Sequence, residues 1–519
     1  MEEEPLFDLL NDPIIRVQGS NDPPTAHTLP EIFALVSNGN PIEFSDLQAH
    51  QSHAWHAFLC QLGAIALHTA GESTVTARSA SEWKELLLHI TDGQRQPWCL
   101  VVPDLAKPAF LQPPVPEGSL YKWKNEAREP DLLDLLVTAK NHDVKRRRLS
   151  TPSADHWVFA LTSLQTMDGF PGRNNYGIVR MNGGYGNRAG IAVCASDRPS
   201  VRFRRDCSLL LERRDELASQ FGFDGLRGTA LLWLKPWDGT KSIPIVECDP
   251  LVIEICRRVR LTASGDDITA RFIGTAVPRI HSGETKGNVG DPWIPVRKKD
   301  AAGLTAKNLS YNILQDVIFG SDYEPSAASI VRQEDGESPV IVGRILARGK
   351  GKTEGYFERI IPCPPKVKRM LASLDGRRTL GSLARERIDL TTIAKNKVLK
   401  PAILNLLQGG PEKLKFDDDR ANPFSDSFEC MVDAAFFPSL FDSVDLDPNV
   451  ARQKWVAQLL IFARTILDDA VRGTPIPTVR RYRAISAAER GFEGSARKNF
   501  PDNFPTKAGG TTNGELGTK

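Results

Sequence analysis

Residues 161–188 read LTSLQTMDGFPGRNNYGIVRMNGGYGNR and include six glycines. Glycines spaced this closely disfavour a continuous helix or strand, because each one costs backbone entropy. They also permit positive φ angles and let a ligand or another backbone approach closely. Polar side chains suited to phosphates and base edges accompany them: Arg173, Asn174, Asn175, Arg180, Asn182, Asn187 and Arg188. The stretch predicts a polar loop that admits a nucleic acid, with a long structural loop as the alternative.

The composition is that of an ordinary globular protein. The 519 residues are 41% hydrophobic and 25% charged, and this length allows two to four domains. Because the net charge is only +2, nucleic-acid binding would have to depend on local basic patches. Such patches occur at residues 145–148, 202–205, 257–260, 297–299 and 480–483.

The eight cysteines include no CxxC pair, which argues against the common zinc spacings and indicates reduced cytoplasmic thiols. His50, His53 and His56 fall on one expected helix but spread over too wide an arc to meet one ion. We therefore predict no metal and no cofactor. The acidic N-terminus lacks the apolar region of a signal peptide, and no 18-residue apolar run occurs. These features predict a cytoplasmic protein without membrane contact.

Periodicity divides the chain into a mixed part and a helical part. Helices are expected over 30–38, 45–70, 80–91 and 308–319, and alternating strand-like runs fill much of 199–300. Beyond residue 365 the pattern is helical, over 366–390, 396–408, 425–443, 448–472 and 477–490. The polar, glycine-rich end of the chain predicts disorder. The fold class is α+β, with a mixed α/β domain over 1–362, a helical domain over 363–498 and a disordered tail over 499–519.

Two further segments are candidates for nucleic-acid contact. The basic segment (residues 140–148) is either a finger against a nucleic-acid backbone or a solvated loop. Its candidate contact residues are Lys140, Asn141, His142, Lys145, Arg146, Arg147 and Arg148. Residues 340–361 alternate as a β-hairpin around RGKGKTEG, whose GKT suggests a P-loop; Leu346 stands where that motif requires glycine, so we reject nucleotide binding.

Several motifs resemble CasA, the large subunit of type I-E CRISPR Cascade complexes. The stretch LQTMDGFPGRNNYGIVRMNGG resembles the glycine-loop region of that family. The other similar segments follow in the family's order: FDLLNDPIIRV, PAFLQPP, LDLLVTAKNHDVK, KGNVGDPWIPV and ARGKGKTEGYFER. The resemblance covers about residues 7–360, and for the helical part it implies only the architecture of a four-helix bundle.

The resemblance implies roles for individual residues. The glycine-loop residues would contact DNA: Gly169, Phe170, Gly172, Arg173, Asn174 and Asn175. Lys286 would make a groove or phosphate contact, and the basic segment would reach toward the guide RNA. A wedge hairpin would open duplex beside the protospacer-adjacent motif (PAM) with Arg348, Lys350, Gly351, Lys352 and Thr353. Thr353 stands where the family often has glutamine, so Lys352 is a second candidate for the wedging residue. The CxxC zinc pairs of some members are absent.

The function implied is non-catalytic recognition of the PAM in duplex DNA, with assistance to R-loop formation. The implied partners are guide RNA, target DNA, other Cascade subunits and a nuclease, either a recruited helicase–nuclease or a domain of another subunit. Two alternatives stay open: a nucleic-acid-binding scaffold without motif preference, and an enzyme with a dispersed active site. The sequence shows none of the compact catalytic motifs that would favour the enzyme.

Overall fold

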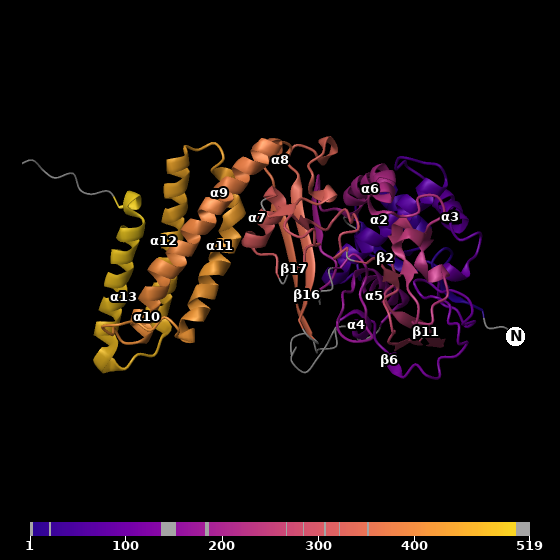
Figure 1. Cartoon of the computed structure of the whole chain (residues 1–519), viewed down its shortest axis with the longest axis horizontal. Helices are drawn as coiled ribbons and strands as arrows, with labels where there is room; N and C mark the ends of the chain where they lie inside the picture. Colours follow the sequence, from indigo (N-terminus) through magenta and orange to yellow (C-terminus); the bar gives the residue numbers. More distant parts are fainter. Residues whose placement is uncertain are drawn as a thin grey trace, which may run out of the picture. The chain divides into compact units, whose positions relative to one another are not determined.

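The computed structural model describes residues 4–19, 22–135, 152–181, 186–265, 267–283, 285–305, 308–320, 322–349 and 352–504. The chain forms two compact units (Figure 1). Unit 1 comprises Met1–Leu309 and Asp316–Leu374, and unit 2 comprises Ser310–Gln315 and Asp375–Lys519. Unit 1 mixes helices with small sheets and unit 2 is helical, so the fold is α+β as predicted.

Five helices contribute to the core of unit 1: α1 (Leu29–Ser37), α2 (Ser52–Thr69), α3 (Ala80–His89), α5 (Ala154–Met167) and α6 (Pro199–Phe221). Helix α2 is buried on nearly every side, including Trp55 and Phe58. A Cβ atom at Gly63 would lie 3.0 Å from Phe203 of α6 and 3.2 Å from Phe33 of α1. Glycine at this position therefore permits the close approach of three helices, at the usual entropic cost of glycine within a helix.

The remaining elements of unit 1 are mostly short strands. They are β1 (Leu6–Asp8), β2 (Ile15–Gly19), β3 (Thr25–His27), β4 (Ile42–Phe44), β5 (Cys99–Val101), β6 (Asn125–Ala127), α4 (Asp131–Asp134), β7 (Gly190–Cys194), β8 (Thr229–Leu231), β9 (Ile243–Pro244), β10 (Cys248–Ile253), β11 (Arg258–Ser264), β12 (Asp267–Ile273), β13 (Ile280–His281), β14 (Val296–Arg297), β15 (Tyr323–Glu324), β16 (Val340–Gly349), β17 (Lys352–Pro362) and α8 (Pro365–Leu371). Most pairings are antiparallel; β8 with β10 and β9 with β13 are parallel.

The sheet β17-β16-β7 confirms the predicted hairpin. Strands β16 and β17 pair from Val340↔Pro362 to Gly349↔Lys352, with a register shift between Ala347 and Arg348. Strand β7 pairs with the other edge of β16, from Val340↔Cys194 to Arg344↔Gly190. Because β7 follows the glycine-rich stretch directly, one small sheet joins that stretch to the hairpin.

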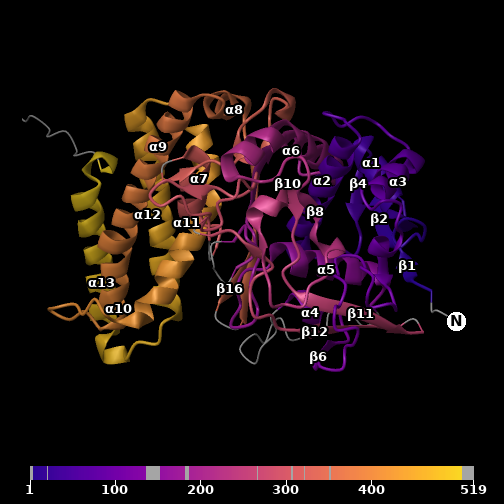
Figure 2. The same cartoon turned by 45° about the vertical axis from the view of Figure 1, so that its right-hand side comes forward.

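Unit 2 is built from long helices that run side by side in Figures 1 and 2. They are α9 (Leu374–Ile393), α10 (Lys400–Leu407), α11 (Asn422–Asp442), α12 (Pro448–Gly473) and α13 (Thr478–Asn499). A π-helical turn, Ala394–Leu399, joins α9 to α10, so these two count as one helix and the arrangement agrees with the predicted four-helix architecture. The predicted break near residue 395 is thus a π turn. Pro401 explains it, because proline lacks a backbone donor and its ring crowds the preceding turn of a helix.

Aromatic side chains fill the interior of unit 2. The rings of Phe436 and Trp455 lie 6.0 Å apart, edge to face. Helix α7 (Tyr311–Phe319) contributes its first turn to this unit. Tyr311 donates its hydroxyl to Glu429 at 2.8 Å, and Asp433 accepts its backbone N–H at 2.7 Å.

The structure corrects the start of the predicted disordered tail. Helix α13 extends to Asn499, and Phe500 is only 4% exposed. Asn503 Nδ2 then donates to the carbonyl of Gln453 at 2.8 Å. Phe500 and Phe504 supply apolar surface within a stretch whose overall composition is polar. Residues 505–519 lie outside the described part of the chain. The predicted domain boundary at 362/363 precedes α8, whereas the two compact units divide at Leu374.

Among the described helices, none has both the length and the apolar character needed to cross a membrane.

Candidate nucleic-acid interface

The glycine loop (residues 168–187) begins later than the sequence predicted. Helix α5 continues to Met167, and Leu161, Leu164 and Met167 are buried. Their spacing of three residues gives α5 an apolar side. Residues 161–167 are therefore helical, although the sequence predicted a loop there. Beyond Asp168, Gly172 accepts the backbone N–H of Asn175 at 3.0 Å. The turn that this bond closes exposes Arg173, Asn174 and Asn175.

The structural alternative is correct for one glycine of this loop. A Cβ atom at Gly177 would lie 2.5 Å from the carbonyl carbon of Gly169, so the two limbs of the loop touch there. Ile178 N donates to Asp168 O at 2.9 Å beside this contact. Gly172 differs, since a Cβ atom there would meet nothing within 4 Å. Space for an approaching ligand therefore exists at Gly172 and not at Gly177.

Lys286 and the glycine loop line one groove of about 350 Å³. Phe170 and Tyr176 come from the loop, with ring centroids 5.7 Å apart, and Lys286 comes from the segment after β13. Lys286 is exposed and has a φ of 50°, and its carbonyl accepts the N–H of Gly303 at 3.1 Å. The fold thus brings together two predicted contact regions that are separated by more than a hundred residues.

Two of the residues predicted to form the wedge have buried side chains. Arg348 and Thr353 pair across the hairpin and are 6% and 5% exposed, so neither side chain is displayed at the turn. Arg348 Nη1 instead lies 2.7 Å from Asp168 Oδ1. Lys350 and Gly351 lie outside the described residues, and for Lys352 only the backbone pairing with Gly349 is described.

The glycine loop and the hairpin are hydrogen-bonded to each other. Asn187 N donates to Leu346 O of β16 at 3.0 Å, and Arg188 N donates to Met167 O at 2.9 Å. The loop therefore leaves α5 and returns beside it, and its last residues bond to the hairpin before β7 begins. No local pattern indicates this junction, because its partners are far apart in the chain.

All residues of the basic segment lie outside the described residues, so its predicted contacts stay predictions. The helical turn α4 precedes it and is well anchored. Asp134 is 1% exposed, and its Oδ2 lies 2.9 Å from His50 Nε2 and 2.9 Å from Gln51 Nε2. Sequence reasoning missed Asp134, since nothing local indicates that its partners come from residues 50 and 51.

The three histidines that suggested a metal have separate surroundings. His50 contacts Asp134, His53 lies against Gly190 and Trp293, and His56 Nε2 lies 2.8 Å from Asp206 Oδ2. Burial lowers the pKa of His56 to about 4, with Arg202 acting in the same direction. Within the described part of the chain, no group of three or more His, Cys, Asp or Glu residues is arranged to hold a metal ion.

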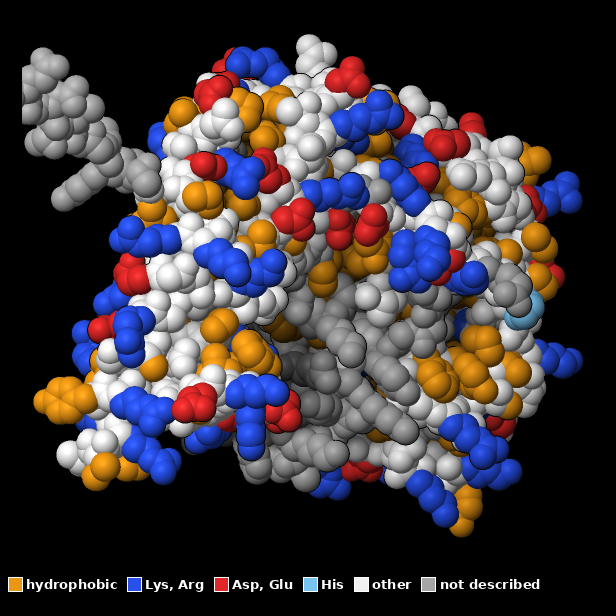
Figure 3. All heavy atoms as spheres, turned by 60° about the vertical axis from the view of Figure 1, so that its left-hand side comes forward, with side chains coloured by type: hydrophobic (Ala, Val, Ile, Leu, Met, Phe, Trp, Pro, Cys, Tyr) orange, Lys and Arg blue, Asp and Glu red, His pale blue; other side chains and the backbone are white. Residues whose placement is uncertain are grey.

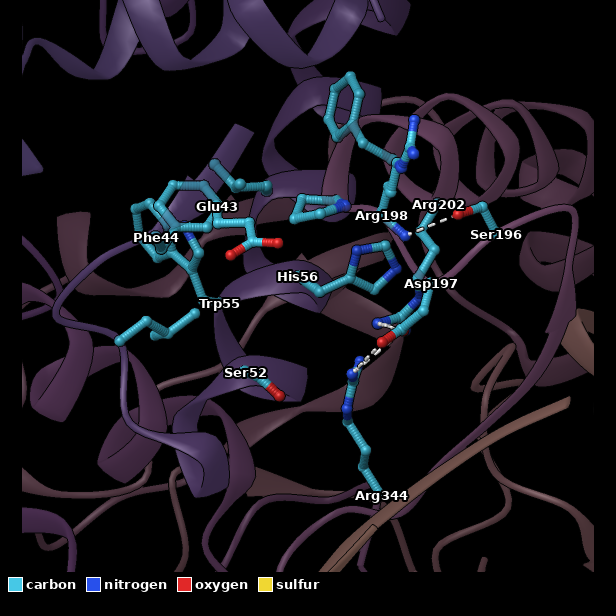
Figure 4. Close-up of a pocket in the computed structure, with 14 residues that line it drawn as sticks. Glu43, Phe44, Ser52, Trp55, His56, Ser196, Asp197, Arg198, Arg202 and Arg344 are labelled. Carbon is cyan, nitrogen blue, oxygen red and sulfur yellow. Dashed lines mark hydrogen bonds and ion pairs between the residues drawn. The ribbon is translucent and has the colours of Figure 1, made fainter. Parts of the chain in front are cut away.

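A second hollow of about 380 Å³ adjoins His56 (Figure 4). Arg344 Nη2 lies 2.9 Å from Asp197 Oδ2, and Arg202 Nη1 lies 3.7 Å from Asp197 Oδ1. Figure 4 shows these charged groups on one side of the hollow, opposite Phe44 and Trp55. The two arginines are engaged by the protein's own carboxylate, so this hollow is a weaker nucleic-acid candidate than the groove at Lys286.

On the face drawn in Figure 3, Lys and Arg side chains are interspersed with Asp and Glu and do not form one continuous basic surface. This agrees with the net charge of +2. Binding to a nucleic acid would therefore depend on local sites such as the exposed turn of the glycine loop.

No protein-family model and no curated protein sequence matches the chain. Solved structures do match it over nearly its whole length. Cse1 from Acidimicrobium ferrooxidans superposes with a TM-score of 0.63 at 14% identity, covering 97% of this chain and 100% of that one. Thermobifida fusca Cse1 gives 0.62 at 15% identity, covering 96% and 98%.

A chain of a structure titled CRISPR RNA-guided surveillance complex gives a TM-score of 0.55 at 14% identity, covering 95% of this chain and 99% of that one. The agreement includes both the mixed part and the helical part, because almost the full length is superposed in each comparison. The chain has the fold of the Cse1/CasA proteins.

Proposed function

We propose that this chain is the large subunit of a type I-E CRISPR Cascade complex and that it recognises the PAM in duplex DNA without catalysing a reaction. The observation that carries the proposal is the groove shared by the glycine loop and Lys286, in a chain that has the Cse1/CasA fold along almost its full length. The motif resemblance over residues 7–360 assigned DNA contacts to those same two regions.

The exposed turn of the glycine loop supplies the chemistry for reading DNA. Arg173, Asn174 and Asn175 present donors and acceptors of the kind that contact base edges and phosphates. In the minor groove the pattern of donors and acceptors distinguishes mainly A·T from G·C pairs, and a turn with free space at Gly172 can approach closely. Lys286, on the groove that Phe170 and Tyr176 of the loop also line, adds a positive charge for a phosphate or groove contact.

The hairpin would open the duplex beside the PAM. Inserting side chains between base pairs costs a few kcal/mol in unstacking, which pairing between guide and target offsets. Because the side chains of Arg348 and Thr353 are buried, we expect the wedging side chain to belong to the turn between the strands, whose basic residues are Lys350 and Lys352.

The partners follow from the same proposal. They are guide RNA, target DNA carrying a PAM, the other Cascade subunits, and a nuclease that is recruited or belongs to another subunit. One structural neighbour is a chain of an RNA-guided surveillance complex, which supports assembly of this kind. In such complexes the guide reads the sequence, and the protein reads the short motif and the duplex geometry.

A randomised-PAM depletion assay tests the proposal. The chain is co-expressed with the Cascade subunits, nuclease and guide RNA of its source, and surviving target plasmids are sequenced. We expect depletion of a small set of motifs, lost when this chain is omitted. Equal depletion of every motif would favour the scaffold without motif preference. Turnover of nucleic acid by the purified chain alone would favour the enzyme.

A further inference from the structure

Asn174, on the exposed turn of the glycine loop, has a left-handed backbone conformation with a φ of 66°. The hydrogen bond from Asn175 N to Gly172 O closes the turn, and Asn174 is the third of its four residues. A positive φ at the third position of a turn favours glycine, with asparagine as the usual second choice. Glycine would therefore form this turn as well, and the backbone alone does not require the side chain of Asn174.

The segment that follows β12 holds Asn174 in place. Thr275 N donates to Asn174 O at 2.9 Å. A Cβ atom at Gly274 would lie 2.8 Å from Asn174 Cβ, 3.0 Å from its carbonyl oxygen and 3.7 Å from its carbonyl carbon, and these are the three nearest atoms that it would meet. Because residue 274 is glycine, the turn can rest directly against this backbone.

The holding segment is itself fixed to unit 1. Thr275 is only 5% exposed, and Ala276 N donates to Gly239 O at 2.8 Å. Gly274, by contrast, is exposed. The contact with Asn174 is therefore made by a surface residue whose immediate neighbours in the chain are anchored.

The same end of the β11–β12 pair also holds the limbs of the glycine loop. Ile273, the last residue of β12, pairs with Arg258, the first residue of β11. Arg257, which precedes β11, donates to the carbonyls of Gly169, at 3.2 Å, and of Tyr176. The exposed turn is thus supported at its tip and on both sides by residues from one end of one strand pair.

The side chain of Asn174 is exposed, and none of the described hydrogen bonds involves its amide. Asn175, the next residue, differs because its Nδ2 donates to Arg173 O at 3.4 Å. An asparagine amide offers both a donor and an acceptor. In the minor groove both kinds of base pair present acceptors, and a G·C pair adds one donor, so a fixed amide can distinguish them.

We propose that Asn174 reads a base pair of the PAM with its side-chain amide, and that Gly274 is the positioning residue that sets the direction of this amide before DNA binds. The inference rests on the proposed function and adds the residue that carries its specificity. A turn held in advance loses less conformational freedom on binding, which leaves more of the contact energy for discrimination.

Discrimination is measured as a ratio of two affinities of the guide-loaded complex. The two duplexes carry the most and the least depleted motifs of the randomised-PAM assay. Asn174→Gly keeps a backbone that accepts positive φ and removes the amide, so we expect the ratio to fall about tenfold. Affinity for the least depleted motif should stay as in the wild type, which a general loss of structure would not allow.

Gly274→Ala tests the positioning. The added Cβ atom would meet Asn174 first, so the turn must shift away from it. We expect a fall of the ratio similar to that of Asn174→Gly, with an unchanged melting temperature because Gly274 is exposed. Adding Gly274→Ala to Asn174→Gly should lower the ratio no further, since the positioning acts through the amide that is already absent.

Gly225→Ala is the matched control. It makes the same substitution elsewhere in unit 1, where a Cβ atom would lie 3.3 Å from Ala218 Cβ. We expect this variant to keep the wild-type ratio. A similar fall for Gly225→Ala would show that crowding anywhere in unit 1 disturbs DNA reading, and would overturn the role of Gly274.

A wild-type ratio for Gly274→Ala, or losses that multiply in the double variant, would also overturn the positioning. A wild-type ratio for Asn174→Gly would overturn the reading by Asn174 and leave the proposed function to other contacts. A wild-type complex without any preference would instead remove the proposed function, and this inference with it.

Should Gly274→Ala fail to fold, amide hydrogen exchange of the unbound wild-type chain decides the positioning. The N–H of Thr275 should exchange slowly, because the carbonyl of Asn174 accepts it. Exchange as fast as that of an unprotected amide would show that the turn is not held before DNA binds.

Discussion

Arg173 is the most direct residue-scale probe of DNA contact, because it is exposed on the turn of the glycine loop. Arg173→Glu replaces a positive side chain that could contact a phosphate with a negative side chain that would repel it. We expect affinity of the assembled complex for target duplex to fall about tenfold at low salt, with an unchanged melting temperature. Arg227→Glu reverses an exposed arginine elsewhere in unit 1 and is the control. Equal losses for both variants would contradict a specific contact at Arg173.

His56 gives a prediction for the pH dependence of stability. Its pKa is lowered to about 4 by burial, so between pH 6.5 and 4 the unfolded chain binds a proton that the folded chain does not. Stability therefore falls as the pH drops through this window, by roughly 3 kcal/mol for His56. Urea unfolding at several pH values measures the slope. Buried His53, whose pKa is also lowered, contributes in the same direction.

His56→Gln provides the comparison for that slope. Glutamine can still donate to Asp206 but does not titrate. The stability of the variant should therefore decline less steeply between pH 6.5 and 5, and the remaining decline would include the contribution of His53. A slope identical to that of the wild type would mean that His56 is not buried in the neutral form.

The exposure of a side chain was predictable where it depends on the local sequence and was not predictable where it depends on distant partners. Of the polar side chains predicted to form the surface of the loop, Arg173, Asn174 and Asn175 are exposed, whereas Arg180, Asn187 and Arg188 are buried. Arg348 also stands in a basic stretch, yet its side chain is buried because it pairs with Asp168, 180 residues earlier in the chain. No pattern near Arg348 indicates that partner.

At the scale of elements, the hairpin could be predicted because alternation and a glycine-rich turn are local signals. Helix α5 was not predicted at all, and the glycines that follow it obscured the apolar spacing of residues 161–167. The hydrogen bond from Asn187 to Leu346 could not be foreseen, since it joins segments that only the fold brings together. The candidate site was thus predictable as separate segments and not as one interface.

The hairpin is expected to open DNA, and the burial of Thr353 limits the substitutions that can test this to the turn. Thr353 is buried and should be kept, whereas Lys350 and Lys352 are replaced by serine. If the turn wedges the duplex, R-loop formation on a fully paired target should slow by about tenfold. A target already mismatched beside the PAM lacks the unstacking cost, so the variant should recover on it. Equal loss on both targets would show that the turn supplies affinity alone.

For the whole molecule, the division into a mixed and a helical part was readable from the change in periodicity after residue 362. The π turn before Pro401 and the ordered residues 499–504 were not, because each depends on packing within unit 2. The net charge of +2 predicted only that nucleic-acid binding would depend on local basic patches, and on the face in Figure 3 basic side chains are interspersed with acidic ones.

Assembly gives the last prediction. The basic segment is expected to dock the chain onto guide RNA, so alanine at Arg146, Arg147 and Arg148 should weaken association with the guide-loaded complex. Each phosphate contact contributes to the decline of binding with salt, and the removal of up to three contacts should make that decline shallower. Titrations at several salt concentrations measure both quantities. The control is alanine at Arg480, Arg481 and Arg483, an equally basic run on α13. If the basic-segment variant keeps its affinity and its salt slope, the segment is a solvated loop, and docking must depend on another surface of unit 1.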